Sequence, residues 1–334
     1  MSPRSTLRLL VLSGALVAVL LPAFSQASPA ASSAKASQGM IAFSAPVHGI
    51  SQVFTIRPEG TGLRQVTHEP FNTGQYGLTW SPDGNSLLYT VNGTGTSRPD
   101  EIVKSAANGS GATVTSPPCS GTCLGDDFPD YSPDGKKIAF ERAFGPIVNN
   151  NATGGVFIFT MNLDGRGLRK LTQGGSEAHQ AQWSPNGKEI AFQRWNITAK
   201  PRNESAIEVM NADGSNVRRL TPWRMRATDP RWSPNGKRIL FNTNGEPVQF
   251  KSANLFTIRP DGTGLVQLTH YKGGPLQAWA DGWSPDGTQI LFERLNTIGP
   301  EVGGYYVLNL HTRHIRRLTA VRIHDNDPRA AWGK

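Results

Sequence analysis

The chain has 334 residues, of which 36 are glycine and 24 are proline, and charged residues make up only 18% of it. This composition excludes a coiled coil or a long helical protein, and the 8 Trp and 14 Phe argue against a disordered chain. The formal net charge is +9, which we interpret first as a contribution to solubility. Many turn formers together with many aromatic residues favour a fold of short strands.

The first 27 residues have the pattern of a secretory signal peptide. Arg4 and Arg8 precede an apolar run from Leu9 to Phe24, and small residues follow it at the expected cleavage position. The run is shorter than the ~20 residues that span a bilayer. We therefore expect a secreted protein, periplasmic or extracellular, with residues 28–38 as a flexible leader. We expect no transmembrane segment after signal removal and no nucleic acid as a partner.

A short phrase recurs along the chain in steps of 49 to 52 residues. Each copy has an aromatic residue followed by Ser-Pro and then by Asp-Gly or Asn-Gly. The copies begin at Trp80, Tyr131, Trp183, Trp232 and Trp283, and a truncated copy begins at Trp332. A fixed period of this length indicates a solenoid, a propeller or an array. Proline followed by Asp-Gly or Asn-Gly predicts a tight turn between two strands.

Each repeat contains four predicted strands, A to D. The aromatic strand A is followed by an apolar strand B, such as Lys137–Phe140, and then by a strand pair that ends in Leu-Thr. Four antiparallel strands per repeat are typical of a propeller blade. The chain starts with a B strand at Met40–Phe43 and ends with an A strand at Ala330–Lys334. We therefore predict an all-β, six-bladed propeller over residues 39–334, with one blade assembled from both termini.

The phrase Trp-Ser-Pro-Asp-Gly-Lys-x-Ile-Ala-Phe, as it stands nearly unchanged at Tyr131–Phe140 and Trp183–Phe192, resembles the repeat of TolB-type six-bladed propellers. The resemblance covers residues 40–334. It extends to the propeller part only, because TolB itself has an α/β domain before its propeller. It implies a bacterial ring scaffold, and the role of a complete TolB protein is not transferred with it.

The two cysteines, Cys119 and Cys123, are expected to form a disulfide. Export permits such a bond, and the three-residue spacer would close a small loop. A metal or redox pair is the alternative, but two cysteines without further ligands make a poor zinc site.

The D–A and B–C loops share one face of such propellers and vary here in length and composition. Functional residues concentrate in variable loops on a rigid frame, so we expect the working surface on this face. Arginine with aromatic residues has the composition of a protein or glycan contact patch. The candidate binding residues are Arg142, Arg194, Trp223, Arg226, Trp279 and Arg294. In the alternative interpretation, these arginines pair with neighbouring acids and hold the blades together.

Histidines and carboxylates on the same face permit a second hypothesis, a polysaccharide-active, lyase-like enzyme. Some propellers similar to that of TolB are lyases with a His-rich metal site at the channel mouth. The ligands of a divalent metal ion would be His68, His179, His270, His324 and Asp327. No recognised metal-binding spacing, nucleophile motif or phosphate-binding loop accompanies them.

The leading hypothesis is therefore a non-enzymatic, exported, monomeric propeller without a cofactor. Its expected partner is an envelope or secreted protein, or an anionic surface polysaccharide.

Overall fold

The computed structural model describes residues 39–68, 74–93, 99–148, 151–152, 154–174, 177–198, 204–243, 253–272, 276–296, 303–319 and 330–333. All of them belong to one compact unit, Gln38–Lys334. The predicted signal peptide and leader lie outside the described residues. None of the helical segments among the described residues has the length and apolar character needed to cross a membrane.

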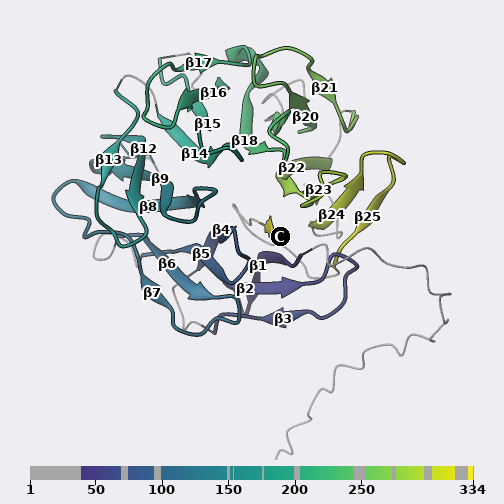
Figure 1. Ribbon diagram of the computed structural model, residues 1–334, viewed down its shortest axis with the longest axis horizontal. Helices are drawn as coiled ribbons and strands as arrows, with labels where there is room; N and C mark the ends of the chain where they lie inside the picture. The colour runs from purple at the N-terminus through teal and green to yellow at the C-terminus, as the bar shows by residue number, and fades with distance from the viewer. Residues whose placement is uncertain are drawn as a thin grey trace, which may run out of the picture. The chain divides into compact units, whose positions relative to one another are not determined.

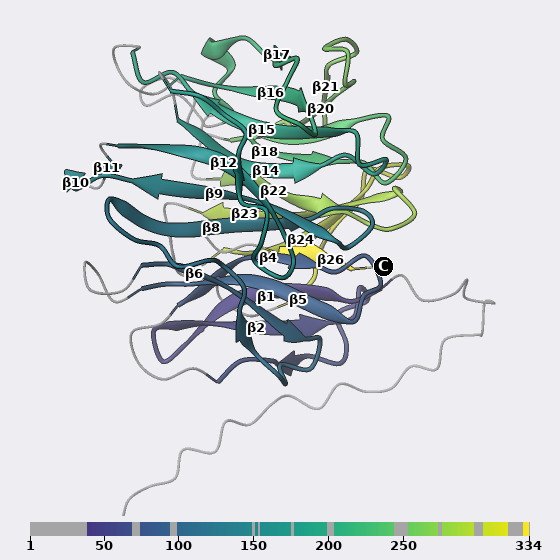
Figure 2. The ribbon, with the colours of Figure 1, turned by 60° about the vertical axis from the view of Figure 1, so that its left-hand side comes forward.

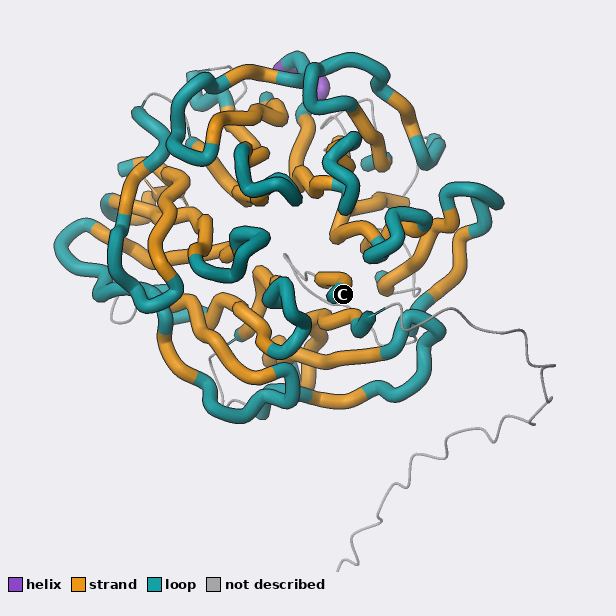
Figure 3. The backbone as a smooth tube through the Cα atoms, viewed as in Figure 1, coloured by secondary structure: helices purple, strands orange, loops and turns teal. Residues whose placement is uncertain are grey.

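Six four-stranded antiparallel sheets surround a central channel (Figure 1). We call them blades 1 to 6 in chain order, and Figure 3 shows their strands in orange and the connecting turns in teal. From the inner to the outer strand, blades 1 to 3 consist of β26 (Ala330–Trp332), β1 (Ile41–Val47), β2 (Ile50–Ile56) and β3 (Arg64–Gln65); β4 (Gln75–Trp80), β5 (Ser86–Val91), β6 (Glu101–Ala106) and β7 (Thr113–Val114); and β8 (Cys123–Tyr131), β9 (Lys137–Phe144), β12 (Gly155–Asn162) and β13 (Arg169–Lys170). Blades 4 to 6 consist of β14 (Ala178–Trp183), β15 (Glu189–Trp195), β16 (Ser205–Asn211) and β17 (Arg218–Arg219); β18 (Ala227–Trp232), β19 (Ile239–Thr243), β20 (Leu255–Ile258) and β21 (Val266–Gln267); and β22 (Leu276–Trp283), β23 (Gln289–Asn296), β24 (Gly304–Asn309) and β25 (Ile315–Arg317).

Two small elements lie outside this scheme. A hairpin of β10 (Ile147–Val148) and β11 (Asn151–Ala152) is inserted between β9 and β12, and Figure 2 shows it projecting beyond the neighbouring strands. A 3-10 turn, η2 (Trp223–Met225), connects β17 to β18.

The core lies between the blades, so each B strand is covered on both of its faces. Ile138, Ala139 and Phe140 in blade 3 are fully buried, and so are the corresponding residues of the other five B strands. A strand buried on both faces has a continuous apolar run rather than an alternating one. The hydrophobic clusters therefore join neighbouring blades, as where Phe43 of blade 1 packs with Tyr305 of blade 6, their ring centroids 5.1 Å apart.

The recurring Ser-Pro-Asp-Gly phrase forms the turn between strands A and B. In blade 2, the Ser81 hydroxyl donates to Asp83 at 2.5 Å and accepts from the Ser86 amide at 2.9 Å. Gly84 follows with φ of 71°, a conformation that glycine adopts at little cost. This serine is therefore part of the turn and its hydrogen bonds, as the sequence pattern predicts.

The ring closes through a blade built from both ends of the chain. Strand β26 pairs antiparallel with β1, with Ile41 opposite Trp332 and Phe43 opposite Ala330. The Trp80 indole of blade 2 also donates to the Ala331 carbonyl at 3.1 Å. The prediction of six blades, closed by the two terminal strands, is confirmed.

Deletion of Ala330–Lys334 should remove the inner strand of blade 1 and leave an exposed edge along β1. Each lost hydrogen bond costs about 1 kcal/mol, so we expect the melting temperature to fall by roughly 5–10 °C. Thermal unfolding and size-exclusion chromatography would measure this, with a deletion of residues 28–37 as the control. If the truncated protein has the same melting temperature as the full mature chain and stays monomeric, closure of the ring by β26 is refuted.

Candidate functional site

The six inner strands surround a cavity of about 280 Å³ in the channel. Its wall combines the aromatic residue of each recurring phrase with the proline that follows in five of them. The wall therefore extends from the middle of the inner strands to the A–B turns. The cavity thus lies at the A–B end of the channel. The sequence predicted the working surface at the opposite end, on the D–A and B–C loops.

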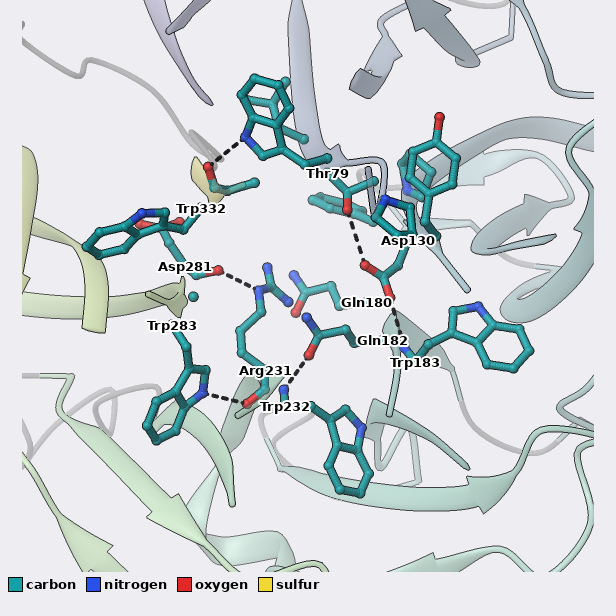
Figure 4. A pocket seen from close by; sticks show the side chains of 18 of the residues that line it. Thr79, Asp130, Gln180, Gln182, Trp183, Arg231, Trp232, Asp281, Trp283 and Trp332 are labelled. Atoms are coloured by element: carbon teal, nitrogen blue, oxygen red, sulfur yellow. Dashed lines mark hydrogen bonds between the residues drawn. The ribbon is translucent and has the colours of Figure 1, made fainter. Parts of the chain in front are cut away.

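The longest polar side chains next to the aromatic residues come from three neighbouring blades, and Thr79 and Asp281 of two further blades also line the cavity (Figure 4). In each inner strand one residue directly precedes the aromatic residue. In blades 3 to 5 it is Asp130, Gln182 and Arg231, whereas in blades 2, 6 and 1 it is Thr79, Gly282 and Ala331. All six line the cavity, so at this position blades 3 to 5 contribute long polar side chains and the other three blades contribute small residues.

β-Bulges interrupt five inner strands beside the cavity. At four of these bulges one residue has a left-handed backbone conformation, with φ of 63° at Gly77, 49° at Phe128, 54° at Gln180 and 58° at Asp229. For a residue other than glycine this conformation costs about 1–2 kcal/mol. Bulges of this kind re-aim side chains and are frequent next to functional sites.

Side chains of the preceding blade hold the amides at these bulges. The three acceptors occupy equivalent positions, directly after the buried aromatic residue of a B strand. The bonds run from Phe128 N to Thr90 Oγ1 at 3.2 Å, from Gln180 N to Glu141 Oε2 at 2.8 Å, and from Ala280 N to Asn242 Oδ1 at 3.0 Å. Each of these blades thus fixes the inner strand of the next one.

Asp130 is one of the two carboxylates that line the lumen, the other being Asp281. Its carboxylate accepts from the Trp183 amide at 2.8 Å and from the Thr79 hydroxyl at 3.3 Å. Burial raises the pKa of Asp130 to about 7, although these hydrogen bonds and the positive charge of Arg231 act in the opposite direction. Asp130 therefore changes its charge near neutral pH.

Three of the predicted binding residues are buried. Arg142 bonds to Asp126 with both Nε, at 2.5 Å, and Nη2, at 2.7 Å, and Arg194 Nε donates to Glu208 at 3.1 Å. Arg226 is 8% exposed. The pairing of arginines with neighbouring acids, the alternative interpretation of the sequence, is thus present at Arg142 and Arg194. Binding of a partner by the predicted residues stays a prediction.

The other three predicted binding residues are partly exposed. Trp223 lies under the guanidinium of Arg219, 4.9 Å from the ring centroid. In blade 6, Arg294 stacks on Tyr306 at 3.9 Å and bonds to its hydroxyl at 2.6 Å. Trp279 lies on the neighbouring strand, where Ala278 is paired with Arg294.

The predicted metal ligands are not gathered within the described residues. His324 and Asp327 lie outside them, and His68 and His270 are exposed residues that follow β3 and β21 in non-adjacent blades. His179 Nδ1 faces Glu141 at 3.3 Å and its Nε2 faces Glu177 at 3.7 Å. In the part of the chain that the structure describes, no three His, Cys, Asp or Glu residues are placed to hold a metal ion.

The two cysteines form the predicted disulfide. Cys119 and Cys123 are bonded with their Cα atoms 5.3 Å apart. The bridge closes the loop that enters β8, on the D–A side of blade 3.

The comparisons with known proteins agree with this geometry. The model of the TolB beta propeller domain matches residues 120–257. The structure of TolB from Acinetobacter baumannii superposes with a TM-score of 0.65 at 17% identity, over 88% of this chain and 66% of that one. Residues 120–257 thus match the TolB beta propeller domain, and the chain has the fold of six-bladed TolB propellers.

Other proteins similar to this chain carry names of enzymes. An oligogalacturonate lyase in complex with manganese has a TM-score of 0.58 at 15% identity, over 86% of this chain and 75% of that one. Dipeptidyl-peptidase 5 of Porphyromonas gingivalis is 39% identical over 61 residues, which are 18% of this chain and 9% of that protein. This chain thus spans only a small part of the curated relative that it matches, and the structural likeness shows the fold alone.

Sequence reasoning missed the lumen of the propeller, although one signal for it is present. The residue before the aromatic is small in three repeats, but it is Asp130, Gln182 and Arg231 in three consecutive ones. A comparison of equivalent positions within the repeat would have found this contrast.

Replacing Asn242 by alanine should destabilise the ring, because the buried Ala280 amide loses its acceptor. An unsatisfied buried group of this kind costs about 2 kcal/mol. Chemical denaturation would measure the change, with the exposed Gln173→Ala as the control. Equal stability of the two variants would show that the bond between blades contributes nothing.

The contacts of His179 predict a loss of stability at alkaline pH. Burial lowers the pKa of His179, but Glu141 and Glu177 outweigh it and raise the pKa from 6.5 to about 9. The stabilisation is therefore complete below pH 6.5 and is lost as the pH rises through 9. Denaturant midpoints between pH 6 and 10 should fall more steeply for the wild type than for His179→Gln. Parallel curves for the two proteins would contradict this assignment.

Proposed function

We propose that the protein is an exported, non-enzymatic propeller scaffold that binds a partner through its lumen. The partner is an envelope or secreted protein, with an anionic surface polymer as the second candidate. The observation that supports this proposal is the cavity, in which aromatic residues, prolines and Arg231 from six strands form one concave wall. Export is supported by the signal-like pattern of residues 1–27.

The composition of the cavity wall favours binding. Trp, Tyr and Arg are the residues that most often dominate the energy of protein interfaces. Trp80, Trp283 and Trp332 are half-buried, so part of each ring is available to a ligand. A partner that enters this cavity would desolvate large apolar surfaces next to a few polar groups, which is the usual anatomy of a binding pocket.

Rigidity of the wall is a second argument. Neighbouring A–B turns lie close together, since a Cβ added at Gly135 would come within 3.7 Å of Pro82 in the preceding blade. The hydrogen bonds between blades hold the bulges behind these turns. A site that is already ordered loses little entropy when its partner binds.

The patch around Trp279 and Arg294 provides a smaller contact surface at the D–A and B–C end. A partner that reaches both ends of the channel would use it together with the lumen. Weakening of the complex by Trp279→Ala alone would place the main contact at that end.

Two glycines allow a test of the lumen without backbone strain. A side chain at Gly282 would meet nothing within 4 Å, and the residue lines the cavity, so Gly282→Phe should fill the lumen. Gly174 has equally open surroundings but is exposed outside the cavity, so Gly174→Phe is a matched control. We expect the mature wild type and Gly174→Phe to capture the same stoichiometric partner from the native cell envelope. Gly282→Phe should lose at least 90% of it.

Capture of the partner by Gly282→Phe at the wild-type level would rule out the lumen as the site. Cleavage of a polysaccharide by the purified protein, or a stoichiometric metal ion that survives dialysis, would support the lyase-like enzyme instead.

A further inference from the structure

We infer that the lumen recognises a carboxylate of a polypeptide partner through the guanidinium of Arg231 and the carboxamide nitrogens of Gln180 and Gln182. This inference takes the location of the site from the proposed function and adds the chemistry of the bound group. Figure 4 shows the three side chains extending from two neighbouring inner strands into the same part of the cavity.

The backbone fixes which way the two glutamine side chains face. Gln180 Oε1 accepts the Asp229 amide at 3.2 Å, and Gln182 Oε1 accepts the Trp232 amide. A backbone N–H can only donate, so the oxygen of each carboxamide must face the wall of blade 5. Each NH2 group is therefore directed away from that bond. Neither nitrogen has a hydrogen-bond partner among the described residues.

The conformation of Gln180 supports a role for its side chain. Gln180 is left-handed at the bulge of β14, whereas blade 2 has Gly77 at the equivalent position. Glycine would remove the cost of this conformation but would also remove the donor from the lumen. Retention of a costly backbone conformation next to a cavity is typical of functional positions.

The guanidinium of Arg231 is held in place by backbone carbonyls. Its Nε donates to Asp281 O at 2.8 Å and its Nη1 donates to Pro230 O at 3.0 Å. These bonds orient the planar group within the lumen. A positioned guanidinium with further N–H donors beside it matches the two oxygens of a carboxylate.

The two acids of the lumen are bonded to its wall. Asp281 Oδ1 accepts the Ala330 amide at 3.1 Å, and both oxygens of Asp130 accept hydrogen bonds, from Trp183 and Thr79. The two carboxylates oppose Arg231 in charge, so an incoming anion binds best when one of them is neutral. Because burial raises the pKa of Asp130 to about 7, protonation below that pH removes one negative charge from the lumen.

A polypeptide is favoured as the source of the carboxylate by the rim of the cavity. The rim consists of half-buried tryptophans and the prolines of the A–B turns, and aromatic residues are enriched at protein interfaces. An Asp or Glu side chain, or a chain terminus, could enter the lumen while the flanking peptide lies on this rim.

The test uses two small probes that differ only in the group in question. N-acetylglutamate N-methylamide carries the carboxylate, and N-acetylglutamine N-methylamide carries a carboxamide of the same shape. Calorimetric and tryptophan-fluorescence titrations with the mature protein should show at least about tenfold tighter binding of the acid, as expected for a charge-assisted hydrogen bond. The affinity for the acid should be higher at pH 6 than at pH 8, and Asp130→Asn should remove this dependence.

The decisive variants preserve the wall. Gln182→Glu and Gln180→Glu keep an oxygen for the Trp232 and Asp229 amides but replace the NH2 donor by a negative charge. Both should reduce the affinity for the acid probe at least about tenfold. Gln173→Glu makes the same change on an exposed residue and should have no effect.

Equal binding of the two probes, or unchanged affinity in both glutamate variants, would overturn the inference. If Gly282→Phe still abolished capture of the partner, the proposed function would stand even though the inference about carboxylate recognition had failed. Selective binding of an oligogalacturonate rather than an oligoglutamate peptide of equal charge would overturn the polypeptide source.

Discussion

The structure depends on the closure of the ring by a three-residue strand. β26 completes blade 1 from the far end of the chain, and Trp80 of blade 2 bonds to its backbone. Without this strand the first blade has an unpaired inner edge and the lumen lacks one wall. Closure also lets each blade pack between two others, so the apolar B strands are buried on both faces. The lumen is therefore a property of the whole ring.

Ring closure is transmitted to the lumen by polar contacts between blades. Side chains such as Glu141 and Asn242 fix the bulges of the next inner strand, and the bulges aim residues such as Gln180 into the cavity. Glu141 also contacts His179, so one buried carboxylate supports both the position of an inner strand and a protonated histidine. Structural polar residues and candidate binding residues are thus connected by the same set of contacts between blades.

The sequence predicts the fold because each repeat contains the residues that determine its own turns and strands. The Pro-Asp-Gly turns, the apolar B strands and the Cys119–Cys123 pair are local signals, and the complementary strands at the two termini follow from counting the repeats; the structure has each of them. The site could not be predicted in the same way, because the six residues of the lumen are about 50 positions apart and meet only in the closed ring. The direction of the Gln180 and Gln182 amides depends on backbone donors of another blade, which no pattern in the sequence reveals.

The central claim is that the A–B end of the channel binds the partner. Hydrogen–deuterium exchange of the mature protein, alone and with its captured partner, tests this claim most directly. The account predicts slower exchange in the A–B turns and the adjoining inner-strand segments, such as residues 180–188 and 231–237. Protection confined to the opposite end, around Trp223 and Trp279, with unchanged exchange in the A–B turns, would contradict it.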